Sequence, residues 1–279
     1  MIGSGDAGDV THPWRRVKRT LGEVAFDALD LAALTRPRTE RLARKQPRRR
    51  VLVTGVYRPG SLMAGAVERL GSERHEVAFA LGSTTAADPR LADRTVAEGL
   101  DAGKFENLNR LLAAGAMEDP DWLLVVDDDL RLPPRFLDRF VALCERFGLD
   151  LAQPAQSLRS HSAWKVTRRR PAMLLRETRF VEIGPVTAFG RAAAAELLPF
   201  PELRYGWGLD LHWAAVAASH GWRLGVVDAL PVRHELGVVA AAYAREDAVD
   251  EAARFLAERP YLPSERAGDV VAVHRRLRP

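Results

Sequence analysis

Short apolar runs alternate with segments of helical periodicity along most of the chain. The runs have the length and the β-branched content of buried strands, and they lie at 51–57, 75–81, 122–126 and 149–154. The segments between them place apolar side chains at three- and four-residue spacing, and they lie at 61–71, 103–115 and 133–147. Strands that alternate with helices predict an α/β fold with a parallel, doubly wound sheet.

The alternation becomes irregular after Pro154. The expected strands there are 168–170, 178–183 and 222–228, and the expected helices are 191–199 and 211–219. Residues 238–279 predict two helices and a polar tail. The expected organisation is therefore a basic helical arm and linker at 1–49, a catalytic domain at 50–240 and a helical tail at 241–279.

The arm carries an amphipathic helix that begins near Trp14. Its apolar positions recur every three or four residues, and they are Trp14, Val17, Leu21, Val24 and Ala28. Basic residues cluster in its first turns, and they are Arg15, Arg16, Lys18 and Arg19. Two interpretations remain open: the apolar stripe packs on the main domain with the arginines in solvent, or the helix lies on an anionic membrane surface. The segment 36–38 is expected to end the helix, and 46–50 to form a basic linker.

Charge and composition argue against several classes of protein. The chain of 279 residues has a net charge of +4, but residues 1–50 hold 12 Lys and Arg against 6 Asp and Glu, so the remainder is close to neutral. This distribution argues against a nucleic-acid-binding fold, which would carry its basic surface on the domain itself. A single cysteine, Cys144, excludes an internal disulfide. With no membrane span and no cleavable signal, we expect a cytoplasmic protein, with peripheral contact to the inner face of the membrane left open.

Three consecutive carboxylates follow the strand at 122–126: Asp127, Asp128 and Asp129. Side chains alternate along a strand, so Asp127 and Asp129 are expected on one face and Asp128 on the other. Like charges this close repel, and a divalent cation relieves the repulsion. Open α/β sheets bind ligands at the carboxyl ends of their strands. The triplet therefore predicts an acidic metal site, for which Mn²⁺ or Mg²⁺ is the expected ion and Asp129 the first candidate ligand.

Four classes of protein place such an acid pair after a strand: a sugar-nucleotide transferase, a nucleotidyltransferase, a haloacid-dehalogenase-type phosphatase and a plain structural cation site. The phosphatase requires its nucleophilic aspartate on an early strand and a Thr or Val beyond the second acid. Here two strands precede the triplet, and Leu130 and Arg131 follow it. The phosphatase is therefore disfavoured.

Further motifs make the chain resemble GT-A glycosyltransferases, glycosyltransferase family 2-like, and most closely domain of unknown function 707. The motifs are Ala152-Gln-Pro-Ala155, His161, Val166-Thr-Arg-Arg-Arg170, Val181-Glu-Ile183, Tyr205-Gly-Trp-Gly-Leu-Asp210 and Gly225-Val-Val-Asp228 with His234. The resemblance covers about residues 120–240, and the GT-A similarity extends it back to about 51. It implies a Rossmann-like mixed, mainly parallel sheet flanked by helices.

The resemblance also implies roles around the acid triplet. Asp127 would face the nucleotide ribose and share the metal with Asp129, while Asp128 would bridge or be structural. His234 would complete the metal ligands, unless it is an ordinary loop histidine. Asp210 would be the base that deprotonates a hydroxyl acceptor; the alternative is a helix cap.

The remaining candidate residues lie at the ends of expected strands and helices. Lys104 and Asn107 share a helix face that lies near the nucleotide in GT-A proteins, or they form an exposed cap. Thr54, Tyr57 and Arg58 end the first strand, where GT-A enzymes contact the base. The expected acceptor- or sugar-binding residues are Tyr205, Trp207, Trp213 and Glu182, and the aromatic ones among them are equally compatible with the core.

The expected function is metal-dependent transfer of a sugar from a nucleoside-diphosphate sugar to a hydroxyl acceptor, with inversion. The alternatives are a nucleotidyltransferase on a similar sheet and a GT-A scaffold that only binds. A nucleotidyltransferase usually has a Gly-rich basic loop after its first strand, and 58–61 is too short to count as one.

Overall fold

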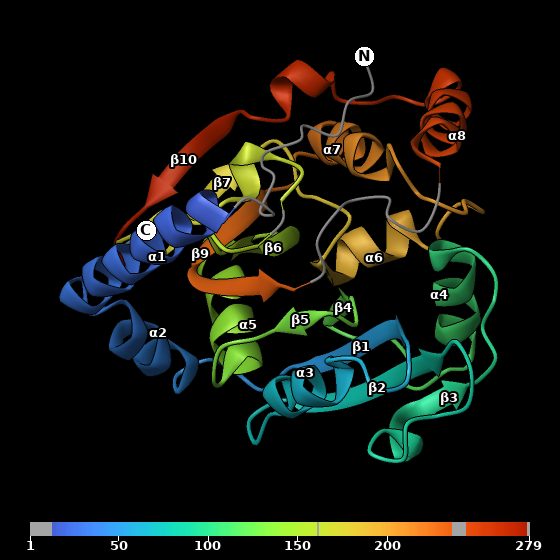
Figure 1. Ribbon diagram of the computed structural model, residues 1–279, viewed down its shortest axis with the longest axis horizontal. Coiled ribbons are helices and arrows are strands. Elements are labelled where there is room, and N and C mark those ends of the chain that lie inside the picture. Colours follow the sequence, from blue (N-terminus) through green and yellow to red (C-terminus); the bar gives the residue numbers. More distant parts are fainter. Residues whose placement is uncertain (1–12, 161, 236–243, 278–279) are drawn as a thin grey trace.

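The computed structural model describes residues 13–160, 162–235 and 244–277 (Figure 1). Its strands are β1 (Arg50–Tyr57), β2 (Glu76–Ser83), β3 (Thr95–Ala97), β4 (Trp122–Val126), β5 (Leu130–Arg131), β6 (Leu151–Gln156), β7 (Leu175–Thr178), β8 (Val186–Gly190), β9 (Leu224–His234) and β10 (Val270–His274). Its α-helices are α1 (Pro13–Ala32), α2 (Thr35–Ala43), α3 (Met63–Leu70), α4 (Lys104–Ala113), α5 (Phe136–Phe147), α6 (Arg191–Leu197), α7 (Leu209–His220) and α8 (Arg245–Ala257).

The strands of the described residues form one mixed sheet in the order β10-β7-β9-β6-β8-β4-β1-β2-β3, with β5 paired to β9 off this path. Strands β1, β2, β3 and β4 pair in parallel, as do β6 and β9. Strand β8 lies antiparallel between β4 and β6. The carboxyl ends of β4, β6 and β9 therefore meet at one edge, which is where an open α/β sheet binds ligands.

Helices cover both faces of the sheet, as the alternating pattern predicts (Figure 1). Along β4, Leu123 and Val125 point to the core shared with α4, α6 and α7, whereas Leu124 and Val126 point to the core shared with α3 and α5. Every residue of β4 is buried, because both faces are covered. The strand that leads into the acid triplet is thus held rigidly at the centre of the molecule.

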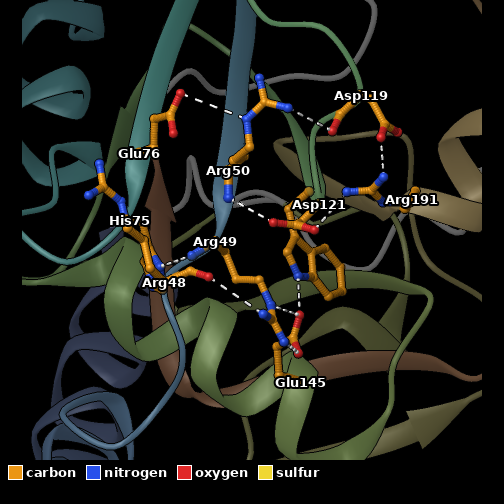
Figure 2. Close-up of polar contacts among 10 residues, drawn as sticks. Arg48, Arg49, Arg50, His75, Glu76, Asp119, Asp121, Glu145 and Arg191 are labelled. Atoms are coloured by element: carbon orange, nitrogen blue, oxygen red, sulfur yellow. Dashed lines mark hydrogen bonds and ion pairs between the residues drawn. The ribbon is translucent and has the colours of Figure 1, made fainter.

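The amino-terminal edge of the sheet is tied together by charged side chains (Figure 2). The guanidinium of Arg49 donates to Glu145 of α5 at 2.8 and 3.0 Å, and the indole of Trp122 donates to the same carboxylate at 2.8 Å. The backbone N–H of Arg50 donates to Asp121, which also pairs with Arg191. These contacts join the start of β1 to β4, α5 and α6.

The arm differs from the expectation at its end. The first helix ends at Ala32, but a second one, α2, begins at Thr35 and includes Pro37 in its first turn, where proline needs no hydrogen-bond donor. The segment 36–38 therefore does not break a helix; it lies within the start of a new one. Among the described residues, no helix is long and apolar enough to cross a membrane.

The C-terminal part also differs from the expectation. One helix, α8, is present, but residues 270–274 form strand β10, which pairs antiparallel with β7 at the edge of the sheet. The expectation of a second helix there is wrong, because the alternating exposure of 270–274 reflects a partner strand about a hundred residues earlier. Residues 236–243 and 1–12, and the motif residue His161, lie outside the described residues.

Two stretches expected as strands have another structure. Residues 165–167 form a 3₁₀ turn and 168–170 continue as a loop, while the strand expected at 178–183 is found earlier, at 175–178. Strands β3, β5 and β8 were not expected. Each is short and is defined by its partner strand rather than by its own periodicity.

Candidate functional site

Asp127, Asp129 and His234 converge at the carboxyl ends of β4 and β9. Their ligand atoms all lie within 4.8 Å of one another. Nε2 of His234 is 2.8 Å from Oδ2 of Asp129. The pairing of Leu130 with His234 and the hydrogen bond from the Glu235 N–H to the Asp129 carbonyl, 2.9 Å long, hold the two segments together. The structure thus brings together the three residues expected to bind the metal.

The chemistry of these three side chains fits a divalent cation. Oδ1 of Asp129 is buried and has no hydrogen-bond partner among the described residues, which is costly for a carboxylate oxygen unless a ligand occupies it. The two carboxylates suit Mn²⁺ or Mg²⁺, which take oxygen ligands, and the imidazole favours the transition metal Mn²⁺ of the two. Burial alone would lower the pKa of His234, but the hydrogen bond that its imidazole donates to Asp129 and the charges of the nearby carboxylates raise it.

Asp128 contacts Arg58 rather than the three candidate metal ligands. The triplet forms a turn after β4, so it is the turn rather than strand alternation that separates Asp128 from its neighbours. Its carboxylate accepts hydrogen bonds from the backbone N–H of Arg58 and from two guanidinium nitrogens of Arg58, all between 2.9 and 3.0 Å. The bond to Asp128 raises the pKa of Arg58. These two residues, both expected to bind nucleotide, bind each other.

Lys104 contacts the acid triplet directly. Its Nζ lies 2.5 Å from Oδ1 of Asp127 and 3.5 Å from the Ile183 carbonyl. Lys104 begins α4, so the cation reaches the site from a helix start packed beside the sheet. Gly184 lies against the same pair: a Cβ at this position would be 2.7 Å from Oδ2 of Asp127. A side chain at this position would therefore require the Asp127 carboxylate to shift.

Glu182 and Asp210 form a second acidic pair beside the metal residues. The Glu182 carboxylate accepts a hydrogen bond from Gln156 at 2.9 Å, and its backbone N–H donates to Gln153 at 2.5 Å. Burial raises the pKa of Glu182 to about 8, and the charge of Asp210 adds to this rise. Burial also raises the pKa of Asp210, to about 7. Because Glu182 interacts electrostatically with both Asp210 and His234, it links the acidic pair to the metal residues.

Asp210 occupies the first turn of α7, after a glycine in a left-handed conformation. Its Oδ1 accepts the N–H of Leu211 at 2.9 Å, so the carboxylate does satisfy a backbone donor at the helix start. The raised pKa shows that this hydrogen bond does not compensate for burial. A carboxyl group poised near neutrality is what proton transfer requires, and capping does not preclude it.

Three residues expected near the nucleotide are buried, and their side chains bond within the fold. Thr54 donates its hydroxyl to the Ala80 carbonyl inside the sheet. The hydroxyl of Tyr57 pairs with Thr95 at 2.7 Å, and its ring lies in the core under α3. Asn107 is buried and donates to the Ala102 carbonyl. Their side chains are engaged within the fold, and their contact with a nucleotide stays a prediction.

The three aromatic candidates also lie inward. Trp213 is 1% exposed and packs edge-on against Phe189 in the core, which favours the alternative that it is a core residue. Trp207 packs against Ala248 and Ala252 of α8, and Tyr205 lies beside them. A contact of Trp207 or Tyr205 with a sugar stays a prediction.

The buried pair Arg176 and Asp228 supports the loop that precedes the acidic pair. Arg176 donates to both oxygens of Asp228, at 2.7 and 2.9 Å, and neither side chain is exposed. Arg176 also donates to the carbonyls of Val166 and Arg168, and Asp228 accepts the Arg170 N–H. A lone arginine in a short strand carries no sequence signal for such a role, and only the topology brings it to Asp228.

Several further residues around the site had not been singled out from the sequence. Ser160 belongs to none of the motifs, yet its hydroxyl accepts a hydrogen bond from the backbone N–H of His234 at 3.0 Å. Gln156 lies two residues beyond the strand expected at 149–154, and Gly184 follows the motif 181–183 directly. Glycine beside an acidic site was the one available signal, because glycine marks positions where backbone approaches another group closely.

Comparison with solved structures identifies the class of fold. No protein-family model matches the chain, and no curated protein matches it. The resemblance to domain of unknown function 707 therefore stays a prediction. Among solved structures, TarS residues 1–349 from S. aureus, in complex with UDP-GlcNAc, gives a TM-score of 0.52 at 13% identity, over 75% of this chain and 65% of that one.

Two further structures are similar at a lower level. Mannosyltransferase PcManGT from Pyrobaculum calidifontis, in complex with GDP-Man and Mn²⁺, gives a TM-score of 0.49 at 18% identity, over 86% of this chain and 76% of that one. GalNAc-T7 with UDP, GalNAc and Mn²⁺ gives 0.49 at 13% identity, over 68% of this chain and 44% of that one. The chain has the fold of the GT-A glycosyltransferases, a mixed and mainly parallel sheet flanked by helices.

Proposed function

We propose that this protein is a glycosyltransferase that moves a sugar from a nucleoside-diphosphate sugar to a hydroxyl acceptor with the help of Mn²⁺ or Mg²⁺. The single observation that carries the proposal is the convergence of Asp127, Asp129 and His234 at the carboxyl edge of a GT-A sheet. TarS, which shares this fold, is in complex with the nucleotide sugar UDP-GlcNAc. The finer resemblance to domain of unknown function 707 is consistent with this proposal and adds no substrate.

The three candidate metal ligands have a defined role in the proposed reaction. Asp127, Asp129 and His234 would hold the cation, which supplies positive charge where the diphosphate leaving group becomes negative. Lys104 neutralises Asp127 at 2.5 Å and brings a second positive charge to the same place. Arg58 is engaged with Asp128, so its contribution to nucleotide binding is to hold the turn that carries the metal residues.

Asp210 is the proposed base. A hydroxyl is a poor nucleophile until its proton is removed, and a carboxyl group with a pKa of about 7 can accept that proton near neutrality. Burial and the charge of Asp210 raise the pKa of Glu182 to about 8, and its carboxyl group accepts a hydrogen bond from Gln156 beside this base. A base opposite the leaving group would produce inversion, which completes the proposed reaction.

Ligand-dependent thermal stability tests the donor class. The melting temperature of the full chain is measured with UDP-, GDP-, dTDP- and CMP-linked sugars, each with and without Mn²⁺. A ligand at a hundred times its Kd stabilises a protein by about 2.7 kcal/mol, which is a shift of several degrees. We expect at least one nucleoside-diphosphate sugar to raise the melting temperature, and only when Mn²⁺ is present.

The same screen separates the alternatives. Nucleoside triphosphates that shift the melting temperature while sugar nucleotides do not would favour a nucleotidyltransferase. A metal-dependent shift with a sugar nucleotide, but no release of nucleoside diphosphate with any hydroxyl acceptor or water, would favour a binding scaffold. If no nucleotide produces a metal-dependent shift, the transferase proposal fails.

A further inference from the structure

Helix α1 packs on the domain through its polar face. The guanidinium of Arg169, which is 3% exposed, pairs with Glu23, Asp27 and Asp30 of the helix. Glu23 also accepts the N–H of Leu158 at 2.7 Å, and Asp30 accepts the N–H of Ala172 at 2.7 Å. These acids recur at three- and four-residue spacing, so they share one side of the helix.

The apolar stripe of α1 therefore faces outward. Its members are half or more exposed: Trp14 at 71%, Val17 at 50%, Leu21 at 66%, Val24 at 62% and Leu31 at 74%. They recur at three-, four- and seven-residue spacing, so they form one continuous face of the helix. This is the reverse of a surface helix that buries its stripe, and a soluble surface rarely exposes so large an apolar patch without a partner.

A basic pocket adjoins the first turns of the same helix. It has a volume of about 240 Å³ and is lined by Arg16, Arg19, Thr20, Arg159, Arg233 and Glu235. Nη1 of Arg19 and Nε of Arg233 are buried and have no hydrogen-bond partner among the described residues. Buried guanidinium donors without acceptors are costly, and they fit an anion with several oxygens.

The charge of the pocket is positive overall. Its one acid, Glu235, is already paired with Arg131 and with Arg233. The acids of α1, Glu23, Asp27 and Asp30, are paired with Arg169 and do not line the pocket. The arginines that line the pocket can thus bind an external anion.

We propose that α1 lies on an anionic lipid bilayer, with its apolar stripe in the interface and the arginine pocket holding the phosphate group of a lipid. Charge complementarity identifies this partner: Arg15, Arg16, Lys18 and Arg19 surround the start of an apolar face, as in helices that lie in a membrane interface. Arg233 and Glu235 flank His234, so the bilayer surface would border the metal centre.

Vesicle flotation with the full chain tests the proposal. The vesicles contain phosphatidylcholine alone or phosphatidylcholine mixed with phosphatidylglycerol. We expect binding to the mixed vesicles to be about tenfold stronger or more, because each basic residue near an anionic surface contributes measurably. The double variant Arg16→Gln with Arg159→Gln should lose about tenfold of this binding, and Leu21→Ser with Val24→Ser should lose a similar amount.

Matched controls come from exposed residues elsewhere. Arg110→Gln removes one positive charge on α4, and Val271→Ser removes one exposed apolar side chain on β10; neither should change vesicle binding. All the substituted side chains are exposed, so the melting temperature should stay within about 2 °C of the parent. None of them belongs to the metal centre, so the result stands or falls independently of the proposed reaction.

Three outcomes would overturn the proposal. One is binding to neither vesicle type, or binding that the helix variants leave unchanged. A second is stabilisation by inorganic phosphate that depends on Arg16 and Arg159 without vesicle binding, which would make the pocket a site for a free anion. The third is a dimer in sedimentation velocity that Leu21→Ser dissociates, because a second copy of the chain would then cover the stripe.

Discussion

Nε2 of His234 lies 2.8 Å from Oδ2 of Asp129, although the two residues belong to segments far apart in the chain. A two-residue antiparallel bridge between β5 and β9 brings them together, with Leu130 opposite His234 and Arg131 opposite Arg233. The acid triplet contributes only part of this site by itself. The late histidine completes it because β9 extends beyond the sheet to reach the turn after β4.

Asp129 and Asp128 should respond differently to the same substitution. Asp129→Asn should weaken Mn²⁺ binding at least about tenfold, since even outer-shell partners of a metal contribute that much. Asp128→Asn should leave Mn²⁺ affinity within about twofold and cost roughly 1 kcal/mol of stability, because it weakens a partly exposed pair with Arg58. Titration calorimetry with Mn²⁺ and urea unfolding measure the two effects. Equal loss of Mn²⁺ affinity in both variants would contradict the division of roles.

Gly184→Ala should disturb the metal site without unfolding the protein. The added Cβ would be 2.7 Å from Oδ2 of Asp127, so the carboxylate must move and Mn²⁺ affinity should fall about tenfold. The matched control is Gly65→Ala in α3, where a Cβ meets nothing within 4 Å; it should be neutral or stabilise by about 0.5–1 kcal/mol. Unchanged Mn²⁺ affinity in Gly184→Ala would show that the approach of this backbone to Asp127 is not critical.

The activity should rise with pH through about 7, because the proposed base Asp210 works only after it loses its proton. Asp210→Asn should retain nucleotide binding and lose turnover by at least about a hundredfold. The apparent pKa seen in the pH dependence of the rate belongs to the pair of Asp210 and Glu182, since the two charges interact. The rate against pH is measured for the parent and for Glu182→Gln. A profile that is flat between pH 6 and pH 8, roughly one unit either side of the expected value, would argue against Asp210 as base.

The stability of the fold should show the opposite dependence on pH. A carboxyl whose pKa is raised on folding binds more protons in the folded state, so its unfavourable effect is absent below the unfolded pKa of about 4 and grows up to about pH 7. Asp210→Asn should therefore reduce the decline in unfolding free energy across this interval. Urea unfolding at several pH values compares parent and variant. Lower stability of the variant at every pH would instead indicate that Asp210 is mainly a helix cap.

The buried pair of Arg176 and Asp228 should contribute heavily to stability. Asp228→Ala leaves a guanidinium buried without its partner, which typically costs about 3–5 kcal/mol. The control is Asp269→Ala, which breaks the exposed pair with Arg179 and should cost no more than about 1 kcal/mol. Urea unfolding at neutral pH measures both. Similar losses in the two variants would mean that the buried pair relaxes through water or other partners.

The alternating apolar pattern and the position of the acid triplet were sufficient to predict the class of fold and the edge that carries the site. These two features are sufficient because β4 is buried on both faces and leads into three acids that packing alone does not require. The triplet also separated as expected into Asp127 and Asp129 on one side and Asp128 on the other. The cause is different, however, because a turn rather than a strand directs these side chains.

Periodicity shows which side chains share a face of a helix or strand but not whether another element covers that face. The sequence by itself therefore determined the main strands and helices, the acid triplet and the two faces of α1. Only the tertiary structure decided that the polar face of α1 packs inward on Arg169, that Trp213 and Tyr57 lie in the core, and that β10 joins the sheet. These outcomes depend on contacts between residues distant in the chain, and local sequence carries no record of such contacts.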